Sequence, residues 1–106
     1  MISFKIYDIG GVLMYSFAEL YDKRCVATYR DLEKTLVDYV DTGSHIVSWA
    51  VIDILKATGL TSRELKRLRN LCLAGEKDQA LRGQTESARE YALVTEHINV
   101  RLKAMV

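Results

Sequence analysis

From residue 31 onward, apolar side chains recur at the spacing of an α-helix. Leu32, Leu36 and Tyr39 fall at positions i, i+4 and i+7, which places them on one face of a helix. Similar stripes continue almost to the C-terminal end. The pattern predicts about four helices between residues 31 and 105, and it constrains the fold more than any other feature of the chain.

Residues suited to beginning or ending a helix divide this region into segments. Thr61 and Glu64 have the spacing of a capping box, in which each side chain bonds the other residue's backbone N–H, and Ser87 and Glu90 repeat that spacing. The helix that begins at Thr61 is expected to end at about residue 74. Gly75 follows that position, and glycine commonly follows a helix end. The first expected helix begins at Thr28 or Asp31, and the others begin near Ser44, Thr61 and Ser87.

The first 29 residues carry a two-residue period instead. Ile2, Phe4 and Ile6 alternate with more polar residues, as in a half-buried strand, and Gly10-Gly11 suits the turn of a hairpin. Further runs rich in strand-forming residues follow. The expected strands cover about residues 2–7, 12–17 and 25–29.

Together these patterns predict one α+β domain spanning residues 1–106. A short N-terminal antiparallel β-hairpin or meander of two to three strands, within residues 2–29, would pack with about four α-helices within residues 31–105. With 49% apolar and 27% charged residues, a chain of 106 residues can bury one core without a metal or a disulfide. The core is expected to contain Leu36, Ile46, Trp49, Ala50, Ile54 and Leu65.

The cysteines and histidines suggest no cofactor or metal site. Cys25 and Cys72 lie far apart and are expected to be buried free thiols. His45 and His97 have no second ligand at helical spacing that shares their face. The chain shows no signal-peptide pattern and no apolar run long enough for a membrane span, so we expect a cytoplasmic protein without a membrane partner.

The segment Asp41-Thr42-Gly43-Ser44 resembles the active-site signature of retroviral-type aspartic proteases. The resemblance implies an aspartate in a loop after a β-strand, paired with the same aspartate of a second chain. The stripe over residues 32–40 is helical, however, and the family's glycine-rich flap is missing. Asp, Thr, Gly and Ser are also ordinary residues at the junction of two helices. We therefore interpret residues 41–44 as such a junction and predict no enzyme activity.

A basic stripe marks the third expected helix. Residues 60–83 hold six basic and three acidic side chains, a net +3 in a chain whose net charge is +1. Four residues at positions i, i+3, i+4 and i+7 face one way: Arg63, Lys66, Arg67 and Asn70. The stripe predicts contact with the acidic surface of a partner protein. Leu60–Glu64 also resembles the start of the helix-turn-helix region of LuxR-type regulators, which implies DNA binding through residues 61–74.

The last helix carries more apolar surface than one small core needs. One stripe contains Leu93, Val100 and Ala104, and another contains Tyr91 and Ile98. Because large exposed apolar patches are uncommon on monomers, the surplus predicts a contact surface. A two-fold homodimer is the commonest assembly that would cover it. We expect Leu93, Val100 and Ala104 to form the contact, with Tyr91 or Ile98 if the other stripe faces outward.

These observations lead to a functional hypothesis. The chain is predicted to be a small non-catalytic protein-binding module, a regulator or inhibitor that acts by occupying the surface of a partner. The alternative is a helix-turn-helix-like DNA-binding transcriptional regulator, with nucleic acid as the second choice of partner. Compact proline-free chains are often encoded by phages or mobile elements, and the hypothesis includes such an origin.

Overall fold

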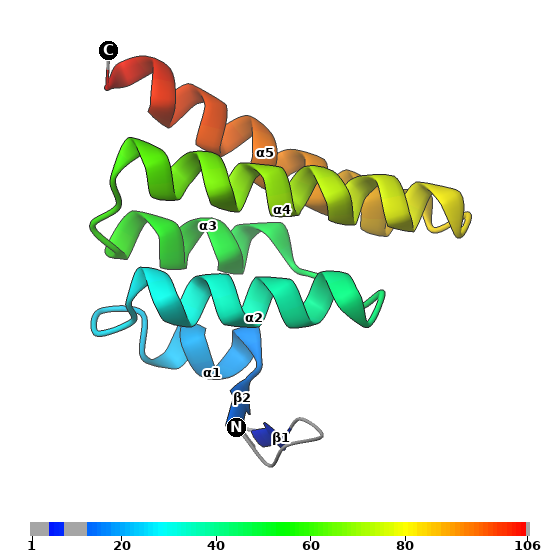
Figure 1. Cartoon of the computed structure of the whole chain (residues 1–106), viewed down its shortest axis with the longest axis horizontal. Helices are drawn as coiled ribbons and strands as arrows, with labels where there is room; N and C mark the ends of the chain where they lie inside the picture. Colours follow the sequence, from blue (N-terminus) through cyan, green and yellow to red (C-terminus); the bar gives the residue numbers. More distant parts are fainter. Residues whose placement is uncertain (1–4, 8–12, 106) are drawn as a thin grey trace.

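The structure, a computed structural model, describes residues 5–7 and 13–105. Helices dominate it (Figure 1). The five helices are α1 (Phe17–Asp22), α2 (Tyr29–Asp41), α3 (Ser48–Ala57), α4 (Ser62–Leu81) and α5 (Thr85–Ala104).

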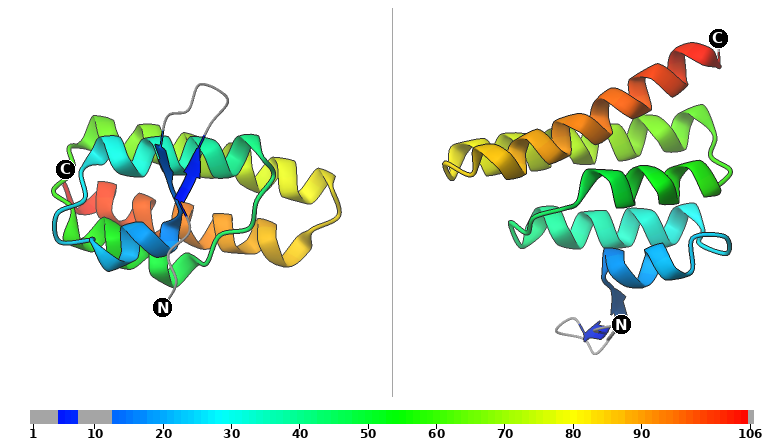
Figure 2. Two further views of the ribbon diagram at one scale, coloured as in Figure 1. Left: turned by 90° about the horizontal axis from the view of Figure 1, so that it is seen from below. Right: turned by 180° about the vertical axis from the view of Figure 1, so that it is seen from behind.

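The helices form two layers. Seen along the layers, α2 and α4 lie in one row, and α1, α3 and α5 lie in the other (Figure 2, left). The most extensive packing joins α4 to α5, which form a long antiparallel hairpin. These two helices lie close together at the hairpin turn and diverge toward the start of α4 and the end of α5 (Figures 1 and 2). The layer of α1, α3 and α5 therefore has one face that points away from α2 and α4.

The predicted α+β class is wrong, because residues 16–105 form helices and connections without a strand. Two three-residue stretches, β1 (Lys5–Tyr7) and β2 (Leu13–Tyr15), pair in antiparallel register at the N-terminal end, but they form no layer of the fold. The remainder of the expected first strand and hairpin turn, residues 2–4 and 8–12, lies outside the described residues.

Helix α1 and the start of α2 occupy positions where the sequence predicted strands. The Ser16 hydroxyl accepts a hydrogen bond from the backbone N–H of Glu19 and so caps α1. In this helix Phe17 and Leu20, three residues apart, both enter the core. Tyr29 begins α2 rather than ending a third strand. The short helix was missed because six residues are too few to show a helical period.

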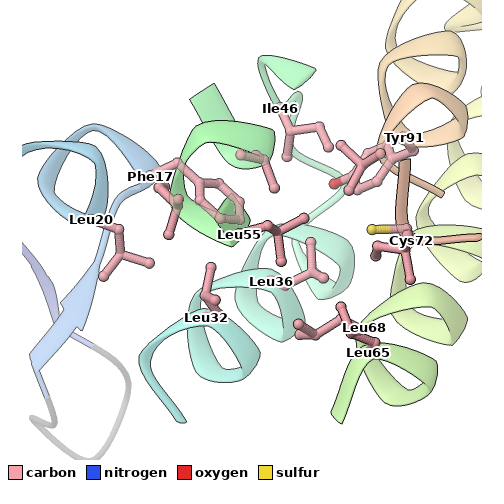
Figure 3. Close-up of a cluster of buried hydrophobic side chains, with 14 of the residues drawn as sticks. Phe17, Leu20, Leu32, Leu36, Ile46, Leu55, Leu65, Leu68, Cys72 and Tyr91 are labelled. Atoms are coloured by element: carbon pink, nitrogen blue, oxygen red, sulfur yellow. The ribbon is translucent and has the colours of Figure 1, made fainter. Parts of the chain in front are cut away.

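The core lies between the two layers and draws side chains from all five helices (Figure 3). Leu36, Ile46, Ile54 and Leu65 are buried as expected, and Ala50 is half-buried. The prediction for Trp49 is wrong, because 60% of this side chain is exposed. Its helix α3 is apolar on nearly every side, so the sequence pattern could not show which face would turn inward. Val51, Ile54 and Leu55 form the inward face.

Two of the predicted helix starts are confirmed. Thr28 and Asp31 form a capping box at α2, and Thr61 and Glu64 form one at α4. The capping box predicted at Ser87 is wrong, since α5 begins at Thr85. The predicted helix end at residue 74 is also wrong, because α4 continues through Gly75 to Leu81.

The cysteines are both free, but only one of them is buried. Cys72 is fully enclosed in the core, and burial raises the pKa of its thiol to about 12. Cys25 is exposed in the turn before α2, so the expectation that it is buried is wrong.

Candidate functional site

The segment that resembles a protease signature forms the end of α2. The backbone N–H groups of Gly43 and Ser44 donate to the carbonyls of Val40 and Tyr39, the paired bonds of a Schellman motif. Gly43 has a φ of 65°, which glycine adopts without strain. Asp41 is an exposed residue of the last helical turn. The predicted helix end is thus confirmed, whereas α3 begins at Ser48 and not at Ser44.

Side chains of the α4–α5 hairpin fix the linker between α2 and α3. The Gln79 side-chain amide donates to the carbonyl oxygen of Gly43 at 3.0 Å, and the Tyr91 hydroxyl donates to that of Ser44 at 2.9 Å. Burial raises the pKa of Tyr91, so its phenol stays protonated and can donate. These bonds fix the point from which α3 starts.

The first turn of α3 receives its cap from another helix. Its N-cap residue, Val47, has no side chain that can accept a hydrogen bond. Instead, the Glu90 carboxylate of α5 accepts from the backbone N–H of Ser48 at 2.9 Å. A carboxylate at this end also complements the helix macrodipole. The cap links the start of α3 to α5. In this position Val51, Ile54 and Leu55 are buried and Trp49 faces outward.

We name the outward surface around this residue the Trp49 face. Its exposed apolar side chains are Val47, Trp49, Leu93 and Val100, and they come from the linker before α3, from α3 and from α5. Tyr21 of α1 packs edge-to-face against Trp49, with 5.4 Å between ring centroids. The face therefore spans all three helices of one layer.

Two grooves flank Trp49 on this face, each of about 390 Å³. The first lies between α1 and α3 and is lined by Tyr21, Tyr39 and Trp49 among others. The second lies between α3 and α5 and is lined by Trp49, Leu93 and Val100 among others. Since Trp49 borders both grooves, the indole forms a ridge between them.

A half-buried histidine lines the second groove. Burial lowers the pKa of His97, and the positive charges of Lys56 and Arg101 lower it further. Its Nε2 atom is buried and has no hydrogen-bond partner among the described residues. The imidazole is therefore neutral at neutral pH, so it adds ring surface to the groove without a charge.

Some of the predicted contact residues of α5 are exposed, and others are buried. Leu93 and Val100 lie on the Trp49 face and are 36% and 64% exposed. Ala104 is also exposed, whereas Tyr91 and Ile98 are fully buried. The stripe with Leu93 thus faces outward, and Ile98 lies in the core. Sequence reasoning missed Trp49, whose only signal was the surplus of apolar residues around α3.

The predicted basic stripe is exposed, but its members face different neighbours. Arg67 forms an ion pair with Glu33 of α2, with 3.3 Å between Nε and Oε2, and Glu33 also accepts a hydrogen bond from the Tyr29 hydroxyl at 2.6 Å. Lys66 instead lines a groove between α4 and α5. Arg63 and Asn70 are exposed on α4. None of the four residues lies on the Trp49 face.

The arrangement of α4 and α5 differs from a helix-turn-helix motif. In that motif two helices joined by a short turn cross at a steep angle, and the second enters the DNA groove. Here α4 runs without interruption for 20 residues and packs antiparallel to α5. The basic segment 61–74 is the first part of this long helix and is not followed by a separate recognition helix.

Comparison of the chain with protein-family models, with curated protein sequences and with solved structures finds no match. Within the described part of the chain, no helix has the length and apolar character needed to cross a membrane. The same residues contain no group of three or more His, Cys, Asp or Glu placed to hold a metal ion. The Trp49 face and the groove beside Lys66 are the surfaces on which a functional proposal can rest.

Proposed function

We propose that this protein is a non-catalytic protein-binding module, a regulator or inhibitor that acts as a homodimer. The observation that carries the proposal is the exposure of Trp49 beside Leu93 and Val100 on one face of the molecule. Tryptophan is among the residues that contribute most to binding when an interface covers them. Apolar side chains grouped in this way favour association over continued contact with water.

A second copy of the chain suits the shape of this face. A two-fold interface joins the same patch of both subunits, so each patch must complement itself. The Trp49 ridge and its two flanking grooves occur on one surface, and this combination of a projection with hollows supports a two-fold contact. In the dimer, the indole of each subunit would enter a groove of its mate and would no longer be exposed to water.

The dimer predicts a clear difference between two leucine substitutions. Leu93→Asp would bury an unpaired charge at the contact, which costs about 3–5 kcal/mol and raises the dimer dissociation constant at least about 100-fold. Leu81→Asp is the matched control, because Leu81 is 80% exposed at the end of α4, away from the Trp49 face. Light scattering with purified protein at micromolar concentration measures the mass of each form.

We expect a dimer mass for the unsubstituted protein and for Leu81→Asp, and a monomer mass with unchanged helical circular dichroism for Leu93→Asp. A monomer mass for the unsubstituted protein would contradict the dimer. So would a Leu93→Asp variant that remains dimeric.

A further inference from the structure

A third groove lies where α4 and α5 diverge. It lies between the first half of α4 and the last turns of α5, and it shares no lining residue with the two grooves of the Trp49 face. Figure 1 shows how the two helices diverge there. Its volume is about 510 Å³. The sequence pattern of α4 alone could not reveal this groove, because half of its lining comes from α5.

Three cationic side chains line the groove. Lys66 and Arg69 come from α4 and Lys103 from α5, while none of the described residues that line it carries a carboxylate side chain. The Arg69 guanidinium contacts the side-chain oxygen of Asn99 across the groove at 3.5 Å, which orients it between the helices. Ser62, the first residue of α4, also lines the groove.

Apolar side chains lie between the cations. Leu102 is half-buried, and Met105 is 49% exposed. A nucleic-acid backbone would use the cations but would leave this apolar surface uncovered. An amphipathic protein segment with carboxylates beside apolar side chains would use both, since a helix of that kind docks its apolar face in a groove between helices.

We propose that this groove binds an acidic, amphipathic helical segment of a partner protein. Carboxylates of the segment pair with Lys66, Arg69 and Lys103, and its apolar side chains cover Leu102 and Met105. The inference names the partner chemistry for the proposed protein-binding function and rests on that function. It does not depend on the dimer, because the groove and the Trp49 face use different side chains.

Fluorescence anisotropy tests the groove with two synthetic helical peptides at physiological ionic strength. One peptide carries Glu along one side and Leu along the other, and the second carries Gln in place of Glu. The test variant is the double substitution Lys66→Glu with Lys103→Glu. The double substitution Lys34→Glu with Lys77→Glu is the matched control, because it makes the same charge change at exposed lysines that do not line the groove.

We expect the Glu peptide to bind the unsubstituted protein and the control alike, and the groove variant about tenfold or more weakly. The Gln peptide should bind weakly to all three. Leu93→Asp should bind the Glu peptide normally, which separates failure of the dimer from failure of the groove.

The proposal would be overturned if the Glu peptide did not bind, or if the groove variant and the control variant bound it equally. It would also be overturned if a DNA duplex bound more tightly than the peptide and if that binding depended on Lys66 and Lys103. The last result would identify the groove as a nucleic-acid surface.

Discussion

Replacing Gly75 with alanine is expected to lower the free energy of unfolding by about 1–3 kcal/mol, the range for overpacking a core. A Cβ atom at this position would lie 2.5 Å from Cε1 of Tyr91. The ring cannot easily retreat, because it is fully buried and its hydroxyl donates to the carbonyl of Ser44. The clash outweighs the gain of about 1 kcal/mol that alanine ordinarily brings to a helix interior.

Gly59→Ala is the control for this substitution. No atom lies within 4 Å of a Cβ placed at Gly59, and its backbone is outside the left-handed region. Its free energy of unfolding should therefore change by less than about 0.5 kcal/mol. Urea unfolding followed by circular dichroism measures both variants. A Gly75→Ala protein as stable as the unsubstituted one would mean that α4 and α5 do not pack as closely as described.

Removing the Arg101 side chain is expected to destabilise the protein by about 1.5–3 kcal/mol, the range for hydrogen bonds to a charged group. The guanidinium donates to the carbonyls of Leu55 and Thr58 at 2.7 Å and 3.2 Å, where α3 ends. The Leu55 carbonyl also accepts from the backbone N–H of Thr58, the residue after α3, at 3.2 Å. A cation at this end of the helix complements its macrodipole. With Glu90 at the other end, α5 thus satisfies both ends of α3.

Arg89→Ala, at an exposed position of the same helix, is the control for Arg101→Ala. It should change the free energy of unfolding by less than about 0.5 kcal/mol. Arg101→Lys should recover part of the loss, since an ammonium retains the charge but lacks the planar fork that reaches two carbonyls. Equal stability of the two alanine variants would contradict the role of Arg101, and urea unfolding gives the comparison.

The helix starts that were predicted from sequence depend on residues close together in the chain. Thr28 with Asp31 and Thr61 with Glu64 complete their capping boxes within four residues, so nearby sequence was sufficient. The role of Gly75 in the middle of α4 could not be predicted from nearby sequence. The ring that fills the space beside it belongs to Tyr91 on the neighbouring helix, and this packing explains why a small residue stands in mid-helix.

The candidate surfaces show the same difference between features that depend on nearby residues and features that depend on packing between distant helices. The outward stripe of α5 was visible as a helical period that includes Leu93 and Val100. Trp49 was assigned to the core because apolar residues surround α3, and the face of α3 that is buried depends on packing against helices distant in the sequence. The basic groove could not be predicted, because the antiparallel packing of α4 and α5 brings Lys103 near Lys66, which lies 37 positions earlier in the chain.

Quenching of tryptophan fluorescence by iodide tests the position of Trp49 most directly, because the chain contains one tryptophan. At a concentration low enough for light scattering to give the monomer mass, iodide should quench the emission strongly, as expected for a side chain that is 60% exposed. Protection should then rise as the dimer forms, and Leu93→Asp should remain quenchable at every concentration. Emission from the monomer that iodide cannot reach would place Trp49 in the core and contradict the proposed interface.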